Sequence, residues 1–160
     1  MALRNIIKDE DALLRKRSRP VDRFDEKLAT LLDDMIETME EANGVGLAAP
    51  QVGILRRAVV VDVGEGPMEL VNPEIIQAEG EQEASEGCLS LPERWGITKR
   101  PLKVTLKAQD RFGNEQTFEG SELLARAFCH ELDHLNGVLF TDLAIRMLTK
   151  EEMEREDKSK

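Results

Sequence analysis

The sequence predicts an α+β domain in which a mostly antiparallel sheet is packed around one central helix, with a second, amphipathic helix near the N-terminus. Three observations predict this fold. Apolar residues with helical spacing come first, short segments rich in β-branched residues follow, and a further helical segment comes after them. Because the helices flank the strands instead of alternating with them, an antiparallel sheet is favoured over a β-α-β array.

Residues 25–42 form the first predicted helix. Its apolar positions recur with the three- and four-residue spacing of a helix and are Leu28, Leu31, Leu32, Met35, Ile36 and Met39. This spacing places them on one face, the stripe by which an amphipathic helix packs on a core. Asp25 is suited to cap the first turn, and Asn43-Gly44 supplies the stop.

The middle of the chain is predicted to form the strands, over residues 57–63, 69–78, 102–108 and 115–119. The first is rich in β-branched residues, and the third alternates apolar with polar residues. The second could be one strand or two, broken at Asn72-Pro73, and residues 110–114 form a turn before the last. A glycine-rich segment, residues 44–51, precedes all four and lacks the Lys-Ser/Thr ending of a phosphate-binding loop.

The second long helix is predicted from about Ser121 to Asn136, with Gly137 just past its end. It contains the motif His130-Glu131-Leu132-Asp133-His134, in which two imidazoles one turn apart share a face and can bind one cation together. Glu131 beside them can reach a water in an open coordination position. Surface histidines are the plain alternative, but the only two histidines of the chain both fall in this motif. We therefore expect a metal-binding central helix and a metal-dependent hydrolase.

A catalytic metal on such a helix needs a third protein ligand. The chain has no further histidine, and Cys88 is the interesting candidate. A cysteine thiol beside a divalent cation loses its proton and can bind the cation as a thiolate. A buried core thiol is the alternative for Cys88. Cys129 points roughly 100° away from His130 around the helix and is expected to be a structural thiol. A disulfide between the two cysteines is not expected in a cytosolic protein.

Length, composition and charge narrow the class of protein. The 160 residues suit one domain. The net charge of −10 argues against nucleic acid as the main partner, so we expect no dedicated nucleic-acid site and interpret Arg15-Lys16-Arg17 with Arg19 as a solvated loop. The chain has no apolar run long enough for a membrane span, and its first residues lack the apolar core of a signal peptide. The expected location is cytoplasmic.

Three motifs stand in order along the chain: GVGLAAPQ at residues 44–51, EGCLS at residues 86–90 and HELDH at residues 130–134. Together they closely resemble the signatures of the peptide deformylase family, and the resemblance extends from Leu13 to about Asp142. It implies an enzyme that removes the formyl group from the N-terminal methionine of new proteins, with N-formylmethionyl polypeptides as partners. On this basis residues 1–148 are expected to form the catalytic domain and residues 149–160 a charged C-terminal tail.

The resemblance implies one divalent metal ion per chain, held by Cys88, His130 and His134. Ferrous iron is expected, and zinc, nickel or cobalt can replace it, because a thiolate with two imidazoles suits any of them. Metal-bound hydroxide would attack the formyl carbon, while Glu131 moves the proton as general base and acid. By resemblance, the Gln51 amide and the backbone N–H of Leu89 would stabilise the oxyanion. Without the resemblance, we would interpret Gln51 as a structural amide that caps the glycine-rich loop.

The resemblance also implies a substrate site. The peptide would bind as an added strand against backbone groups around Gly46 and Gly87, and Gly44 also leaves room for close approach. Glu86 matches one half of a family ion pair with Arg100 that stiffens the Cys88 loop. The positions that match the methionine pocket are Val45, Leu123 and Ala127.

Two positions depart from the family pattern. Cys129 stands where glutamine usually precedes the first histidine of the motif. Trp95 stands where some members carry an arginine that holds the substrate. Trp95 could cover the pocket as an apolar lid or serve only in packing, and the neighbouring Arg94 could substitute for the arginine.

Two alternative functions stay open at this point. A zincin-type peptidase would share the helix but would not use Cys88 as a ligand. A non-catalytic relative would bind metal or a formylated N-terminus without turning it over. We also expect a monomer that acts near the ribosome exit.

Overall fold

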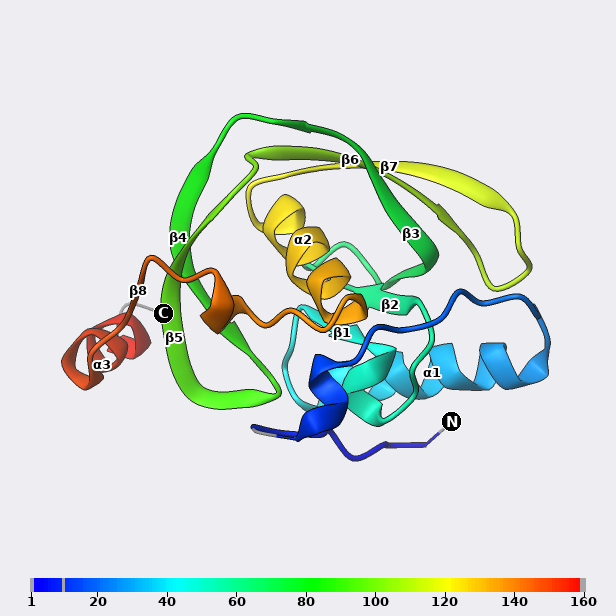
Figure 1. The fold of residues 1–160 in the computed structure, drawn as a ribbon, viewed down its shortest axis with the longest axis horizontal. Helices are drawn as coiled ribbons and strands as arrows, with labels where there is room; N and C mark the ends of the chain where they lie inside the picture. The colour runs from blue at the N-terminus through cyan, green and yellow to red at the C-terminus, as the bar shows by residue number, and fades with distance from the viewer. Residues whose placement is uncertain (1, 10, 159–160) are drawn as a thin grey trace.

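The computed structural model describes residues 2–9 and 11–158, with side chains described up to Arg155. Two antiparallel sheets lie around the helix α2 (Leu123–Leu135), which occupies the centre of the molecule (Figure 1). A five-stranded sheet has the order β1-β2-β3-β6-β7, and a three-stranded sheet has the order β4-β5-β8. The predicted α+β fold with a central helix is therefore confirmed.

The strands of the larger sheet are β1 (Gly46–Ala48), β2 (Ala58–Val61), β3 (Met68–Glu79), β6 (Lys103–Gln109) and β7 (Glu115–Ser121). Those of the smaller sheet are β4 (Gln82–Cys88), β5 (Leu91–Arg100) and β8 (Arg146–Met147). Three short 3₁₀ helices are η1 (Ala12–Arg15), η2 (Ala49–Val52) and η3 (Phe140–Asp142). The strands β1 and β4 are both at the edges of their sheets.

The first predicted helix is confirmed as α1 (Glu26–Glu41). The Asp25 side chain accepts a hydrogen bond of 3.1 Å from the Leu28 N–H and so caps the first turn, as the sequence predicted. Asn43 follows the helix with a positive φ of 56°, a conformation in which asparagine is tolerated. The apolar stripe of α1 packs with β1 and β2 residues in one buried cluster.

The predicted break at Asn72-Pro73 is a bulge inside one long strand. The register between β3 and β6 shifts between Val71 and Glu74, which places Pro73, a residue without an N–H, where the ladder is interrupted. Asn72 has a φ of 51°, and its side-chain oxygen accepts from the Val21 N–H at 2.8 Å. The bulge therefore bends β3 without ending it.

The second predicted helix begins two residues later than expected, because Ser121 is the last residue of β7 and pairs with Lys103. Gly137 follows the helix with a φ of 75°, which agrees with the predicted stop. The charged tail contains the helix α3 (Lys150–Lys158) beside β8, and Arg146 pairs with Glu152 at 2.8 Å (Figure 1).

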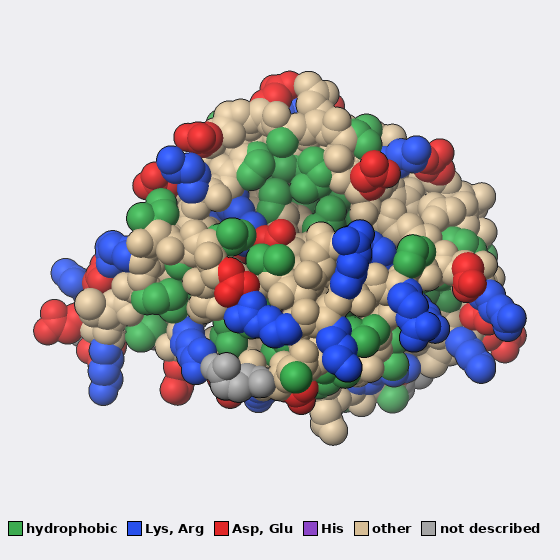
Figure 2. All heavy atoms as spheres, in the orientation of Figure 1, with side chains coloured by type: hydrophobic (Ala, Val, Ile, Leu, Met, Phe, Trp, Pro, Cys, Tyr) green, Lys and Arg blue, Asp and Glu red, His purple; other side chains and the backbone are tan. Residues whose placement is uncertain are grey.

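Surface charge is unevenly spread. Figure 2 shows Lys and Arg side chains across the lower half of one face, with acidic side chains mainly toward its ends and top. Arg15, in the basic cluster that the sequence singled out, forms an ion pair with Asp142. None of the helices in the described part of the chain is long and apolar enough to cross a membrane.

Candidate active site

Cys88, His130 and His134 meet between the two sheets. Cys88 is the last residue of β4, and both histidines lie on the buried face of α2, one turn apart. The Cys88 Sγ atom is 3.3 Å from His134 Nε2, which is 3.2 Å from His130 Nε2. All three donor atoms lie within 4.8 Å of one another. The structure thus brings Cys88 together with the two predicted histidine ligands, from which the sequence separates it by more than forty positions.

The donor set fits a divalent metal. A tetrahedral ion bound at about 2.0–2.1 Å by nitrogen and about 2.3 Å by sulfur keeps its ligand atoms about 3.3–3.6 Å apart. The Cys88–His134 and His134–His130 separations of 3.3 and 3.2 Å are close to this range. His130 Nδ1 lies 2.6 Å from Glu86 Oε2, and an ionised carboxylate only accepts, so Nδ1 carries a proton and Nε2 is the ring atom left to bind a metal. A cation bound by both Nε2 atoms would occupy the point on which the two imidazoles converge.

Glu86 fixes the orientation of His130. Its two carboxylate oxygens accept hydrogen bonds from His130, from Arg100 at 2.7 and 3.1 Å, from Arg126 at 2.7 Å and from Thr98 at 2.9 Å. Burial acts to raise the pKa of Glu86, but His130 and Arg100 outweigh it and hold this pKa well below its usual value. The predicted Glu86–Arg100 ion pair is confirmed, and it keeps an ionised carboxylate against the imidazole.

Glu131 points into the space between α2 and β1. The side chain is only 3% exposed, and its Oε1 atom has no hydrogen-bond partner among the described residues. Burial raises the pKa of Glu131 to about 7. A Cβ atom on Gly46 would lie 2.5 Å from Glu131 Oε2, so glycine at this position leaves the room that the carboxylate occupies. A carboxyl with a pKa near neutrality can both accept and release a proton.

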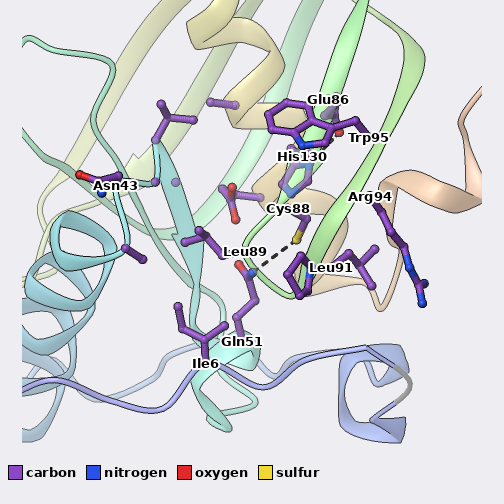
Figure 3. A pocket seen from close by; sticks show the side chains of 18 of the residues that line it. Ile6, Asn43, Gln51, Glu86, Cys88, Leu89, Leu91, Arg94, Trp95 and His130 are labelled. Carbon is purple, nitrogen blue, oxygen red and sulfur yellow. Dashed lines mark hydrogen bonds and ion pairs between the residues drawn. The ribbon is translucent and has the colours of Figure 1, made fainter. Parts of the chain in front are cut away.

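Gln51 joins the glycine-rich segment to the Cys88 loop. Its Oε1 atom accepts from the Ala48 N–H at 2.9 Å, which is the capping role that the residue type suggested. This contact turns the amide nitrogen toward the site, where Nε2 donates to Ser90 Oγ at 3.0 Å and lies 3.6 Å from Cys88 Sγ (Figure 3). A single side chain therefore caps η2 and presents N–H donors beside the ligand cluster.

One cavity of about 810 Å³ is lined by Cys88 and His130 and extends well beyond them. Val45 and Leu123 line it and are 42% and 51% exposed, so apolar surface is open to a ligand, and the buried Ala127 also lines it. The other predicted residues in its walls are Gly44, Gly46, Gln51, Glu86, Gly87, Cys88, Leu89, Trp95, His130 and Glu131. His134, the third member of the cluster, is not among the lining residues and lies behind His130, 3.2 Å from its Nε2 atom.

Trp95 and Arg94 lie on the β4–β5 side of the cavity. Figure 3 shows the indole near the metal-ligand cluster, whereas the Arg94 side chain extends away from it. The Arg94 guanidinium is 3.8 Å from the Asp9 carboxylate, near the N-terminal segment. The Trp95 indole covers Gly87, the residue before Cys88.

Sequence reasoning missed three supporting residues. Arg126 and Thr98 hold Glu86, and Ser90 accepts the Gln51 amide. A signal for Arg126 was present, because it lies four residues before His130 and therefore on the same, inward face of the helix. Thr98 and Ser90 are ordinary polar residues in the sequence, and only the pairing of strands shows that they are buried.

A family model described as polypeptide deformylase matches residues 3–150. The sequence is 61% identical over 155 residues to a peptide deformylase of Caldicellulosiruptor bescii, which covers 97% of this chain and 93% of that protein. It is 59% identical over 160 residues to a peptide deformylase of Acetivibrio thermocellus, covering 100% of this chain and 94% of that one.

Solved structures agree with the sequence comparisons. The crystal structure of peptide deformylase from Thermotoga maritima superposes with a TM-score of 0.87 at 45% identity, covering 89% of this chain and 97% of that one. A class I type b peptide deformylase from Acinetobacter baumannii, bound to Met-Ala-Ser, has a TM-score of 0.83 at 32% identity, covering 88% and 98% of the two chains.

Proposed function

We propose that the cavity between β1, β4 and α2 is the active site of this chain, which belongs to the peptide deformylase family of metal-dependent hydrolases. Like the other members of this family, the chain removes the N-formyl group from new polypeptides. The observation that carries this assignment is the convergence of Cys88, His130 and His134 on one point beside the buried Glu131. In this proposal the three residues hold one divalent metal. When bound, the metal lowers the pKa of water and so supplies a nucleophile near neutral pH.

Glu131 is the proposed general base and acid. Its pKa near neutrality allows it to take a proton from the attacking water and to return this proton to the departing amine. The space beside Gly46 lets the carboxylate reach the cavity from the helix. Formate and a free N-terminal amine are then the two products.

Gln51 and Leu89 are the proposed oxyanion donors. Ala48 fixes the Gln51 amide with its nitrogen toward Cys88, so the donor is oriented before the substrate arrives. Leu89 directly follows the proposed ligand Cys88, and in this proposal its backbone N–H donates to the reacting carbonyl. The Leu89 side chain also packs against Gly44. A Cβ atom on Gly44 would lie only 2.7 Å from the Leu89 Cδ1 atom.

The substrate is proposed to bind as a strand between β1 and β4. Gly46 and Gly87 face the cavity from these two edge strands, so backbone groups are available for pairing. The methionine side chain is placed beside Val45, Leu123 and Ala127. Main-chain pairing explains how one site can accept many polypeptides.

The assignment is tested by formate release from formyl-Met-Ala-Ser, with metal analysis of the same sample. We expect Cys88→Ala to lose both the metal and the activity, because one of the three protein ligands is removed. A zincin-type peptidase would keep its metal in this variant. A metal-loaded wild-type protein that released no formate would favour the non-catalytic relative and would contradict the proposal.

The ion itself is proposed to be ferrous iron, with zinc, nickel or cobalt as substitutes that the same ligands accept. Ferrous iron beside a thiolate is readily oxidised, so the iron form should lose activity on storage in air and the zinc form should keep it. Equal retention by both forms would argue against iron as the working metal.

The partners and location are also proposals. We propose a monomer in the cytoplasm that meets N-formylmethionyl polypeptides near the ribosome exit, where they are made. Sedimentation of the metal-loaded protein tests the monomer. Cosedimentation with ribosomes, at several salt concentrations, tests the docking.

A further inference from the structure

The β4–β5 hairpin has two unlike faces. Glu86 pairs with Gly96 and Ala84 pairs with Thr98, and the side chains of Glu86 and Thr98 are buried toward α2. Gly87 pairs with Trp95, one position along each strand. Because successive side chains point to opposite faces of a strand, Trp95 belongs to the face that is turned away from α2.

The indole of Trp95 lies across Gly87. A Cβ atom built on Gly87 would meet the indole atoms Cε2, Cδ2 and Cζ2 at 2.8–2.9 Å, so the ring system covers the place where another residue would carry a side chain. The absence of a side chain at Gly87 thus brings the indole toward the open edge of β4. Both residues line the cavity.

A peptide that pairs with β4 as an added strand would direct its successive side chains alternately toward α2 and away from α2. This step rests on the proposed function, in which the substrate pairs with the edge of β4 and its methionine points to Leu123 and Ala127 on α2. The next side chain of an extended peptide then points away from α2. It arrives on the same face as the indole, about one strand spacing from Gly87.

We propose that Trp95 is a specificity-determining residue, whose indole receives the side chain of the second substrate residue and favours an aromatic side chain there. Aromatic pairs at such separations contribute enough to change affinity by about two- to tenfold. The first residue would remain under the control of the methionine pocket. The preference among side chains at the second substrate residue would come from its contact with the Trp95 indole over Gly87.

The first test compares kcat/KM for formyl-Met-Phe-Ser and formyl-Met-Ala-Ser. We expect the wild-type protein to prefer the phenylalanine peptide by about two- to tenfold, Trp95→Leu to bring the ratio close to one, and Trp95→Phe to retain most of the preference. Phe112→Leu is the matched control, because Phe112 is 75% exposed in the β6–β7 turn and is not among the cavity-lining residues. This control should keep the wild-type ratio.

The outcomes separate this inference from the proposed function. If neither peptide releases formate, the proposed function fails. If both are deformylated with equal kcat/KM by the wild-type protein, or if Trp95→Leu keeps the wild-type ratio, only the role of Trp95 is overturned.

A second measurement needs no variant, because Trp95 is the only tryptophan of the chain. Its emission can be followed in the metal-loaded protein during titration with the deformylated tripeptides Met-nitroPhe-Ser and Met-Ser-nitroPhe, whose nitroaromatic group quenches an indole that it contacts. We expect stronger quenching at saturation when nitrophenylalanine is the second residue. Equal quenching by both peptides, or stronger quenching from the third position, would overturn the proposal.

Discussion

Glu131 lies beside the three proposed metal ligands and is not itself proposed to hold the ion. Its carboxylate fills the space beside Gly46 and has a pKa raised to about 7 by burial. We predict that Glu131→Ala keeps the metal but lowers kcat for formyl-Met-Ala-Ser by about 10²- to 10⁴-fold, the usual contribution of general acid–base catalysis. Metal content and formate release, measured on one preparation, check this. Turnover close to the wild-type rate would remove Glu131 from the mechanism.

The two cysteines are predicted to react differently. Cys129 is 7% exposed, and burial raises the pKa of its thiol to about 11, so almost none of it is thiolate at neutral pH. In the native protein freed of metal, an alkylating reagent should modify Cys88 and leave Cys129 intact until the protein is unfolded. Mass spectrometry of peptides with and without denaturant measures this, with Cys129→Ala as the control. Rapid modification of native Cys129 would contradict the structural role.

At the scale of elements, the N-terminal segment is anchored to α1 by one buried carboxylate. Asp34 accepts from the Ala2 N–H at 2.7 Å and pairs with Arg4 at 2.9 Å. Burial acts to raise the pKa of Asp34, but the Ala2 and Arg4 contacts outweigh it and lower the pKa below its ordinary value of 3.8. The same segment continues to the site, where the Ile7 N–H donates to the Gln51 carbonyl at 2.7 Å.

We predict that Asp34→Asn lowers the free energy of unfolding by about 2 kcal/mol near neutral pH, the scale of hydrogen bonds to a charged group. Because the folded pKa is lowered, this contribution is present above the unfolded pKa and is lost as the pH falls through the folded pKa. The difference between wild type and variant should therefore shrink in acid. Urea unfolding at several pH values measures it, and Glu40→Gln, on the exposed side of α1, should show little change at any pH.

Elements with an apolar face could be predicted from the sequence, whereas those with a buried polar face could not. The stripe of α1 and the alternation in β6 both reflect burial of hydrophobic side chains, and both were confirmed. The strands β4 and β5 were not predicted, because their buried inner face carries Glu86, which bonds His130, and Thr98 and Arg100, which bond Glu86. Hydrophobic periodicity does not detect a face whose purpose is to support a charged site.

The part of the candidate site that could be predicted from the sequence is the part whose chemistry requires particular residue types. Two histidines four positions apart and a cysteine far upstream were enough to suggest the ligands, and the structure brings them together. The environment of Glu131 depends on the packing of α2 against β1, and the position of Trp95 over Gly87 depends on the pairing of β4 with β5. These contacts are set by register, which residue types alone do not specify.

At the scale of the whole molecule, the ligand cluster joins the two sheets. Cys88 comes from the three-stranded sheet, whereas His130 and His134 come from α2, which packs with β2, β3 and β6 in the main core cluster. A metal held by all three residues would cross-link these two parts of the fold. Because it binds the folded state far better than the unfolded chain, its binding free energy adds to stability.

We predict that removing the metal lowers the melting temperature by about 5–10 °C, since a free ion at 100 times its Kd contributes about 2.7 kcal/mol to a protein of this size. Thermal unfolding with and without a chelator measures the shift. Cys88→Ala should show no such shift, because it lacks one of the three ligands, and Cys129→Ala should show the full shift. Hydrogen exchange after chelation should rise more in β4–β5 than in β3–β6, because only β4 carries a ligand. A uniform rise across both sheets would contradict the selective loss of order in β4–β5 that a link between the two parts of the fold predicts.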